Sequence, residues 1–234
     1  GDNFSPRGHK YIQSFEWDKV PTWIYRIGGV VLKKEIIFRN ERDRLFIRYT
    51  LLEAHSHTTL RLRPFLAFRS VRQWTHENGT ARTEAHAVEQ GVSFRLYEGY
   101  PDLVMQLDSP AAVYHHTPDW YRGLDYPKER ERGYDEPEDL FVPGYFEMPI
   151  ARGESIVFTA SLDARDPATL KPLIADEIEA HDPRDSFYHT LVNAAHQFRQ
   201  QLGGLDYIIA GYPWFKPRAR DTFIAMPGLT LAIG

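Results

Sequence analysis

The sequence contains no cysteine. This absence excludes disulfide bridges, thiolate zinc sites and a cysteine nucleophile, and it is compatible with a reducing compartment. Long apolar runs are absent as well, since no stretch approaches the ~20 residues that a membrane helix needs. The first residues also lack the basic-then-apolar pattern of a secretory signal. We therefore expect a cytoplasmic protein with no membrane partner.

A strong net charge is also lacking. The 28 basic and 32 acidic residues give a formal net charge of -4. This balance provides no overall attraction to nucleic acid or to an anionic membrane. The densest charged run, Lys128 to Arg132, alternates in sign and is typical of a solvated segment. We expect no nucleic-acid partner.

Motifs for phosphate, dinucleotide and metal binding are missing too. There is no glycine-rich phosphate loop, no dinucleotide fingerprint and no G-x-S-x-G nucleophile motif. The only close histidine pairs are His55 with His57 and His115 with His116, and no further ligands accompany them. The sequence therefore predicts neither a cofactor nor a metal site.

Short strand-like segments fill the chain from residue 22 to about residue 162. "RLFIRYTLL" (Arg44 to Leu52) and "VSFRLYEG" (Val92 to Gly99) alternate apolar with polar residues, and β-branched runs bounded by Gly, Pro, Asn or Asp accompany them. Strands at such spacing, without intervening helices, are typical of antiparallel sheets packed as a sandwich. We predict a mainly β fold, with a β-sandwich domain over residues 1–165.

Helical patterns replace the strands after residue 165. Asp166-Pro167 is typical of a helix start, and a second helix is expected around Phe187 to Phe198, with Gly203-Gly204 as its stop signal. A third helix is expected to begin near Asp221. Residues 166–209 are predicted to be linker helices.

The run Phe223 to Gly234 contains no charged residue. Exposed apolar surface is unfavourable in water, so we expect this run to be covered by further structure. We therefore interpret residues 210–234 as the truncated start of another domain.

The segment Thr117 to Phe146 has the character of a long ordered loop. It combines aromatic residues with carboxylates, and the latter include Asp119, Asp135 and Glu138. Aromatic rings can cover the apolar face of a sugar while carboxylates accept bonds from its hydroxyls. The alternative is a surface loop that packs its own aromatic side chains and pairs its own charges.

The pair Arg220-Asp221 has two interpretations as well. Asp221 can be the N-cap of the helix that follows it, with Arg220 solvated. Alternatively, the carboxylate of Asp221 accepts bonds from sugar hydroxyls beside a guanidinium that keeps it ionised.

Four long stretches closely resemble one family, the glycogen debranching enzymes of the bacterial and archaeal amylo-α-1,6-glucosidase type. They are "SPRGHKYIQSF", "RLRPFLAFRSVRQWTHENG", "PDWYRGLDYPKERERGYDEPEDLFVPGYF" and "DYIIAGYPWFKPRARDTFIAMPGLTLAIG". The resemblance implies a large β-sandwich, or supersandwich, joined by linker helices to an (α/α)₆ barrel. That barrel hydrolyses α-1,6-linked glucose of glycogen or related glucans with inversion, and residues 210–234 would be its first part.

The resemblance also implies where substrate is bound. Arg220 and Asp221 match the Arg-Asp of the family's Trp-Gly-Arg-Asp-Thr motif in the sugar pocket, although Arg218-Ala219 stands here in place of Trp-Gly. Trp120, Tyr121, Asp135 and Glu138 are the further sugar contacts that we predict, and the catalytic carboxylates are expected downstream of the chain.

The expected partners are glycogen, or another branched α-glucan, and the protein's own barrel. In this hypothesis the sandwich shapes the active site of the barrel and the chain alone is inactive. The alternatives are a stand-alone glucan-binding module and a protein-interaction β domain.

Overall fold

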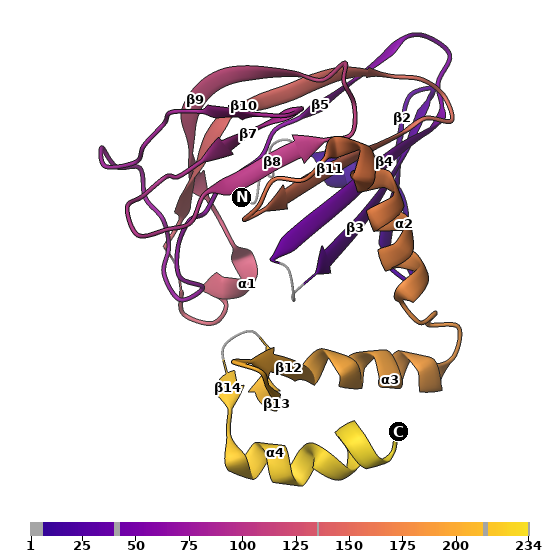
Figure 1. The fold of residues 1–234 in the computed structure, drawn as a ribbon, viewed down its shortest axis with the longest axis vertical. Coiled ribbons are helices and arrows are strands. Elements are labelled where there is room, and N and C mark those ends of the chain that lie inside the picture. The colour runs from indigo at the N-terminus through magenta and orange to yellow at the C-terminus, as the bar shows by residue number, and fades with distance from the viewer. Residues whose placement is uncertain (1–6, 40–42, 135, 213–214, 234) are drawn as a thin grey trace. The chain divides into compact units, whose positions relative to one another are not determined.

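The structure is a computed structural model that describes residues 7–39, 43–134, 136–212 and 215–233. Strands account for 44% of the chain and helices for 21%, so the predicted mainly β class is confirmed. Two compact units are present, Gly1–Ile178 and Glu179–Gly234 (Figure 1). The predicted domain limits at residues 165 and 209 differ from this division and stay a prediction.

An antiparallel sheet of eight strands forms the larger layer of the first unit, in the order β1-β2-β3-β4-β11-β8-β7-β6. A 3₁₀ helix, Gly8–Tyr11, precedes it. The strands are β1 (Ile12–Trp17), β2 (Pro21–Ile27), β3 (Val30–Arg39), β4 (Arg44–Glu53), β6 (His86–Val88), β7 (Gly91–Phe94), β8 (Leu103–Leu107) and β11 (Ser155–Ser161). The predicted strand "RLFIRYTLL" is confirmed as β4, and "VSFRLYEG" is a strand only in its first part, β7.

A second antiparallel sheet of three strands packs on one face of the first. It consists of β5 (Thr58–Leu62), β10 (Glu138–Ile150) and β9 (Val113–Leu124), in that order. Phe146 of β10 lies edge-on to Phe158 of β11, with ring centroids 6.0 Å apart, and both belong to one buried core with Phe94, Met105 and Met148. The sandwich arises because alternate residues of both sheets bury their side chains in this shared layer.

Helix α2 (Leu170–Ala180) covers the opposite face of the larger sheet (Figure 1). It follows a 3₁₀ turn, Pro167–Thr169, at which the carboxylate of Asp166 accepts a hydrogen bond from the amide of Ala168. Leu170 and Ile174 are completely buried against a cluster that includes Phe46 and Val157. The predicted helix start is therefore confirmed, and apolar spacing of four residues fixes which side of the helix meets the sheet.

The expected long loop, Thr117 to Phe146, is wrong for most of its length. Its ends form the paired strands β9 and β10, and only the segment between them, with the short helix α1 (Pro127–Arg130), lies outside the sheet. Irregular pairing between Val142 and Gly144 accommodates Pro143 and Gly144 within β10. Gly144 has a φ of 150°, and a Cβ there would lie 2.1 Å from the carbonyl oxygen of His115.

The second unit contains helix α3 (Phe187–Phe198), a sheet of β12 (Arg199–Leu202), β13 (Leu205–Gly211) and β14 (Phe215–Pro217), helix α4 (Ala219–Met226) and a π-helical turn, Pro227–Leu231. The predicted helix around Phe187 is confirmed, and Ser186 caps it. The stop signal Gly203-Gly204 instead forms the turn between β12 and β13, where both residues have positive φ. Over the described ranges, no helix is long and apolar enough to cross a bilayer.

Ile174→Ala tests the packing of α2. The substitution removes a completely buried side chain from the face that meets Phe46 and Val157, so we expect the free energy of unfolding to fall by about 2–4 kcal/mol. Urea unfolding of the 234-residue chain measures the effect. Asp176→Ala, at an exposed position of the same helix, is the control and should change stability by less than about 0.5 kcal/mol. Equal urea midpoints for the two variants would contradict this packing.

Candidate functional site

The hairpin of β9 and β10 holds three of the predicted contact residues, and they have different environments. Trp120 is 9% exposed and packs edge-on against Phe141, with ring centroids 5.5 Å apart, so its indole belongs to the core. Tyr121, the next residue, is exposed. Because side chains alternate along a strand, the two neighbours face opposite sides of the sheet.

Tyr121 lies in a small cluster on the outer face of the three-stranded sheet. Its hydroxyl accepts a hydrogen bond from Arg63, and its ring lies 4.8 Å from that of Phe65. The guanidinium of Arg63 also lies over the ring of Tyr145, at 5.6 Å. This arrangement offers exposed aromatic surface but no described hollow.

Glu138 is completely buried and accepts four hydrogen bonds. Arg69 donates through Nε and Nη2, the hydroxyl of Tyr126 donates at 2.7 Å, and the amide of Thr75 donates at 3.2 Å. Burial alone would raise the pKa of this carboxyl group, but these donors and the positive charge of Arg69 outweigh it and hold the pKa below its ordinary value. Glu138 is therefore an ionised structural anchor.

The remaining predicted contacts are Asp135, Arg220 and Asp221. Asp135 lies outside the described residues. Arg220 is exposed and Asp221 is half-buried in the second unit. Helix α4 has Arg218 as its N-cap residue, so Asp221 lies within the first turn, and the interpretation of Asp221 as the N-cap is wrong. A carboxylate in the first turn is still favoured by the helix dipole.

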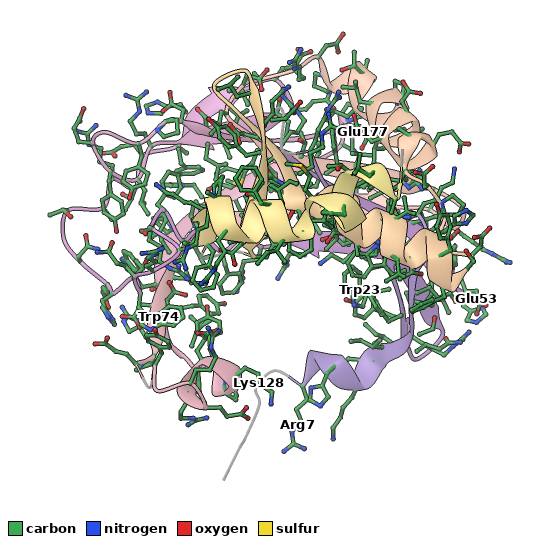
Figure 2. All side chains as sticks on the ribbon, turned by 90° about the horizontal axis from the view of Figure 1, so that it is seen from below. Arg7, Trp23, Glu53, Trp74, Lys128 and Glu177 are labelled. Carbon is green, nitrogen blue, oxygen red and sulfur yellow. The ribbon has the colours of Figure 1, made fainter. Side chains whose placement is uncertain are left out.

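A cavity of about 740 Å³ lies in the first unit, and we call it the Trp74 cavity. Most of its lining comes from the irregular segment between Phe68 and Asn78, with Tyr97 and Tyr100 from a second segment and Gly133, Tyr134 and Glu136 from a third. Figure 2 shows Trp74 on the side of the unit that also carries Lys128 of α1. The three segments meet outside the two sheets, where loops can form a concave surface.

The bonds of Glu138 fix one wall of the Trp74 cavity. Arg69, which Glu138 binds, has its guanidinium carbon 5.0 Å from the ring centroid of Trp74. Tyr126, also bound to Glu138, stacks on Trp74 with centroids 5.1 Å apart and planes 16° apart. Burial, followed by the bond to Glu138, raises the pKa of Tyr126 to about 12, so its hydroxyl remains a proton donor. One buried carboxylate thus positions both groups that pack on Trp74.

Hydrogen bonds to Asn78 and Asp139 fix the far end of the segment. Asn78 donates to the hydroxyl of Tyr97 at 2.8 Å and accepts bonds from the amides of Thr80 and Ala81. Asp139 accepts from the amides of Glu77 and Gly123, and these bonds lower its pKa. The segment is irregular in secondary structure but held at both ends.

Phe68 lies at the start of this segment in an unusual conformation. Its φ is 44°, in the left-handed region that bulky residues rarely adopt. The hydroxyl of Thr75 donates to the carbonyl of Ala67, immediately before it, so surrounding bonds hold the conformation. Strained backbone held in place in this way is common at binding sites.

The sequence contains a partial signal for the Trp74 cavity. The stretch "RLRPFLAFRSVRQWTHENG" carries part of the family resemblance and supplies Phe68 to Asn78, yet the predicted contacts were placed within residues 117–146 and at Arg220-Asp221. Tyr134 and Glu136, which flank the predicted contact Asp135, do line the cavity. The aromatic and acidic character of residues 117–146 therefore indicated one of its three walls.

Comparison with protein families gives two matches along the chain. The model described as "Glycogen debranching enzyme N terminal" matches residues 1–157, and the model described as "Amylo-alpha-1,6-glucosidase" matches residues 193–234. No curated protein matches the chain. Since the first match covers well over half of the residues, the chain belongs to the family of glycogen debranching enzyme N-terminal regions.

Proposed function

We propose that this chain is the N-terminal part of a glycoside hydrolase that removes α-1,6-linked glucose from glycogen or a related glucan. The observation that carries this proposal is the succession of two family matches, an N-terminal debranching-enzyme region over residues 1–157 followed by an amylo-α-1,6-glucosidase match over residues 193–234. In this proposal the first unit shapes the substrate pocket of the barrel, of which residues 210–234 are the first part. Its partners are the glucan and that barrel.

The carboxylates of the predicted contact segment support a division in which the first unit binds substrate and another region carries out the chemistry. An inverting glycosidase needs a carboxylic acid that is protonated at working pH and a carboxylate that activates water, about 6.5–9.5 Å apart. Glu138 and Asp139 both have pKa values held below the ordinary range by their hydrogen bonds. Neither group is therefore suited to be the protonated acid. On the basis of the second family match, the proposal assigns catalysis to the downstream barrel and holds the chain alone inactive.

The anchoring role of Glu138 gives a pH-dependent prediction. Because its pKa in the folded state lies below the unfolded value of about 4.3, its contribution to stability is complete above that value and is lost as the pH falls through the folded pKa. Glu138→Gln removes a charge that Arg69 faces, and we expect a loss of about 2–4 kcal/mol at pH 7. The difference in unfolding free energy between the variant and wild type should become smaller below about pH 4. Urea unfolding at pH 7 and below pH 4 measures this change.

Glu136→Gln is the matched control for this experiment. Glu136 is two residues away and its side chain is 70% exposed, so its removal should leave stability nearly unchanged at both pH values. A Glu138→Gln variant as stable as wild type at pH 7 would contradict the anchoring role.

Glucose release tests the proposed function itself. The 234-residue chain should release no glucose from a branched limit dextrin, whereas the full product of its gene should release it, because the acid and base are supplied by the downstream barrel. A coupled glucose assay at equal molar concentrations makes the comparison. Hydrolysis by the 234-residue chain would show that its own residues are catalytic, and a full gene product without any such activity would overturn the assignment.

A further inference from the structure

Exposed aromatic rings gather at the Trp74 cavity. The side chain of Tyr134 is 59% exposed and that of Tyr100 is 40% exposed. Tyr100 is held edge-on against both Phe68 and Tyr97, with centroids 6.0 and 6.3 Å apart. Exposed ring surface in water is unfavourable, and the C–H face of a pyranose can cover it. The cavity therefore offers stacking surface on two exposed rings, of which that of Tyr100 is held by its aromatic neighbours.

Polar side chains between these rings can form hydrogen bonds with the hydroxyl groups of a ligand. Gln73 is exposed at the cavity and carries both a donor and an acceptor. His76 and Glu136 face each other with Nε2 and Oε1 3.8 Å apart, beyond a strong hydrogen bond, so a hydroxyl has access to both. A ligand with many hydroxyls fits this mixture of donors and acceptors better than an apolar one.

The charges of the lining indicate that the ligand is neutral. The positive charge of Arg69 is compensated by Glu138, directly beneath the cavity. Arg72 and Glu136 contribute one further charge of each sign. A phosphate or nucleotide site needs an excess of positive charge, which this lining does not provide.

The cavity walls are held in position before a ligand arrives. The carboxylate of Glu138 fixes Arg69 and the amide of Thr75, Asn78 orients Tyr97, and Phe68 is kept at a φ of 44°. Fixing side chains in advance reduces the entropy lost on binding. The volume of about 740 Å³ lies within the ~300–1,000 Å³ typical of small-molecule sites.

We infer that the Trp74 cavity binds a short segment of a neutral α-linked glucan chain, with Tyr100 and Tyr134 stacking on its sugar rings. Gln73, His76 and Glu136 bond to the hydroxyls. The linkage of the sugar rests on the proposed function, whereas the carbohydrate class follows from the rings, the polar groups and the balanced charge. The site thus belongs to the first unit and involves three segments, of which the sequence indicated one.

Titration of the 234-residue chain with maltoheptaose tests this inference. We expect saturable binding by calorimetry at millimolar sugar and retarded migration in gels that contain glycogen. Tyr100→Ala and Tyr134→Ala should each weaken the binding of maltoheptaose about threefold to tenfold, because each removes one stacking ring. Tyr134 is exposed, so its variant remains informative even when loss of Tyr100 disturbs folding.

Tyr11→Ala is the control, since Tyr11 is 48% exposed in the first unit and does not line the cavity. It should bind maltoheptaose like wild type. Cellohexaose, with β linkages, should bind more weakly, and inorganic phosphate should not compete. Competition by phosphate, or variants at Tyr100 and Tyr134 that both bind like wild type, would overturn the inference.

The outcome separates this inference from the proposed function. Glucose release by the full gene product, together with unchanged binding by the tyrosine variants, would reject the Trp74 cavity and keep the debranching assignment. Binding of maltoheptaose that is lost in the variants, together with no glucose release by the full product, would keep the glucan site and reject that assignment.

Discussion

The buried carboxylate of Glu138 joins three parts of the first unit that are distant in the chain. It binds Arg69 and the amide of Thr75 in one irregular segment, and the hydroxyl of Tyr126 in another, while its own backbone begins strand β10. An ionised carboxylate without partners would be strongly unfavourable at a position with no exposure. The loops around it are therefore restricted to conformations in which all of these donors reach it.

This constraint explains how a wall without regular secondary structure can be well defined. Segment 68–78 has few hydrogen bonds to neighbouring strands, so its shape depends on side chains that accept hydrogen bonds from its backbone amides. Glu138 accepts from the amide of Thr75, and Asp139 accepts from the amide of Glu77. Both acceptors are adjacent residues at the start of β10. Two carboxylates at the start of β10 thus hold the loop segment against the sheet. The position of Trp74 therefore depends on the position of β10.

The sequence predicted the sandwich because burial of one strand face produces a visible alternation, as in β4, where Ile47, Tyr49 and Leu51 pack in the shared core and polar residues lie between them. It misplaced the hairpin of β9 and β10 because Pro118, Gly123 and Gly144 are breakers in isolation. β9 is an edge strand, where a missing amide at Pro118 is tolerated, and irregular pairing accommodates Gly144.

The candidate site was less predictable than the fold. Whether Trp120 or Tyr121 faces the core depends on strand register, which the local sequence does not fix. Glu138 pairs with Arg69, which is far from it in the sequence, so no local sequence pattern reveals this contact. The positive φ of Phe68 has no sequence signature either, because the residue is not glycine. By contrast, Tyr134 lies in the aromatic and acidic segment that the sequence singled out, and it lines the Trp74 cavity.

The proposed function has a kinetic consequence for the first unit. Its candidate binding groups are aromatic rings and the polar side chains of Gln73, His76 and Glu136, whereas the carboxylates of Glu138 and Asp139 are committed to hydrogen bonds within the protein. Such groups would hold a glucan chain equally well before and during bond cleavage. Uniform binding of this kind lowers KM without raising kcat. Under the proposed function, the kinetic contribution of the first unit would therefore be the capture and alignment of the glucan chain, and the glucosidase region would supply the energy that distinguishes the transition state.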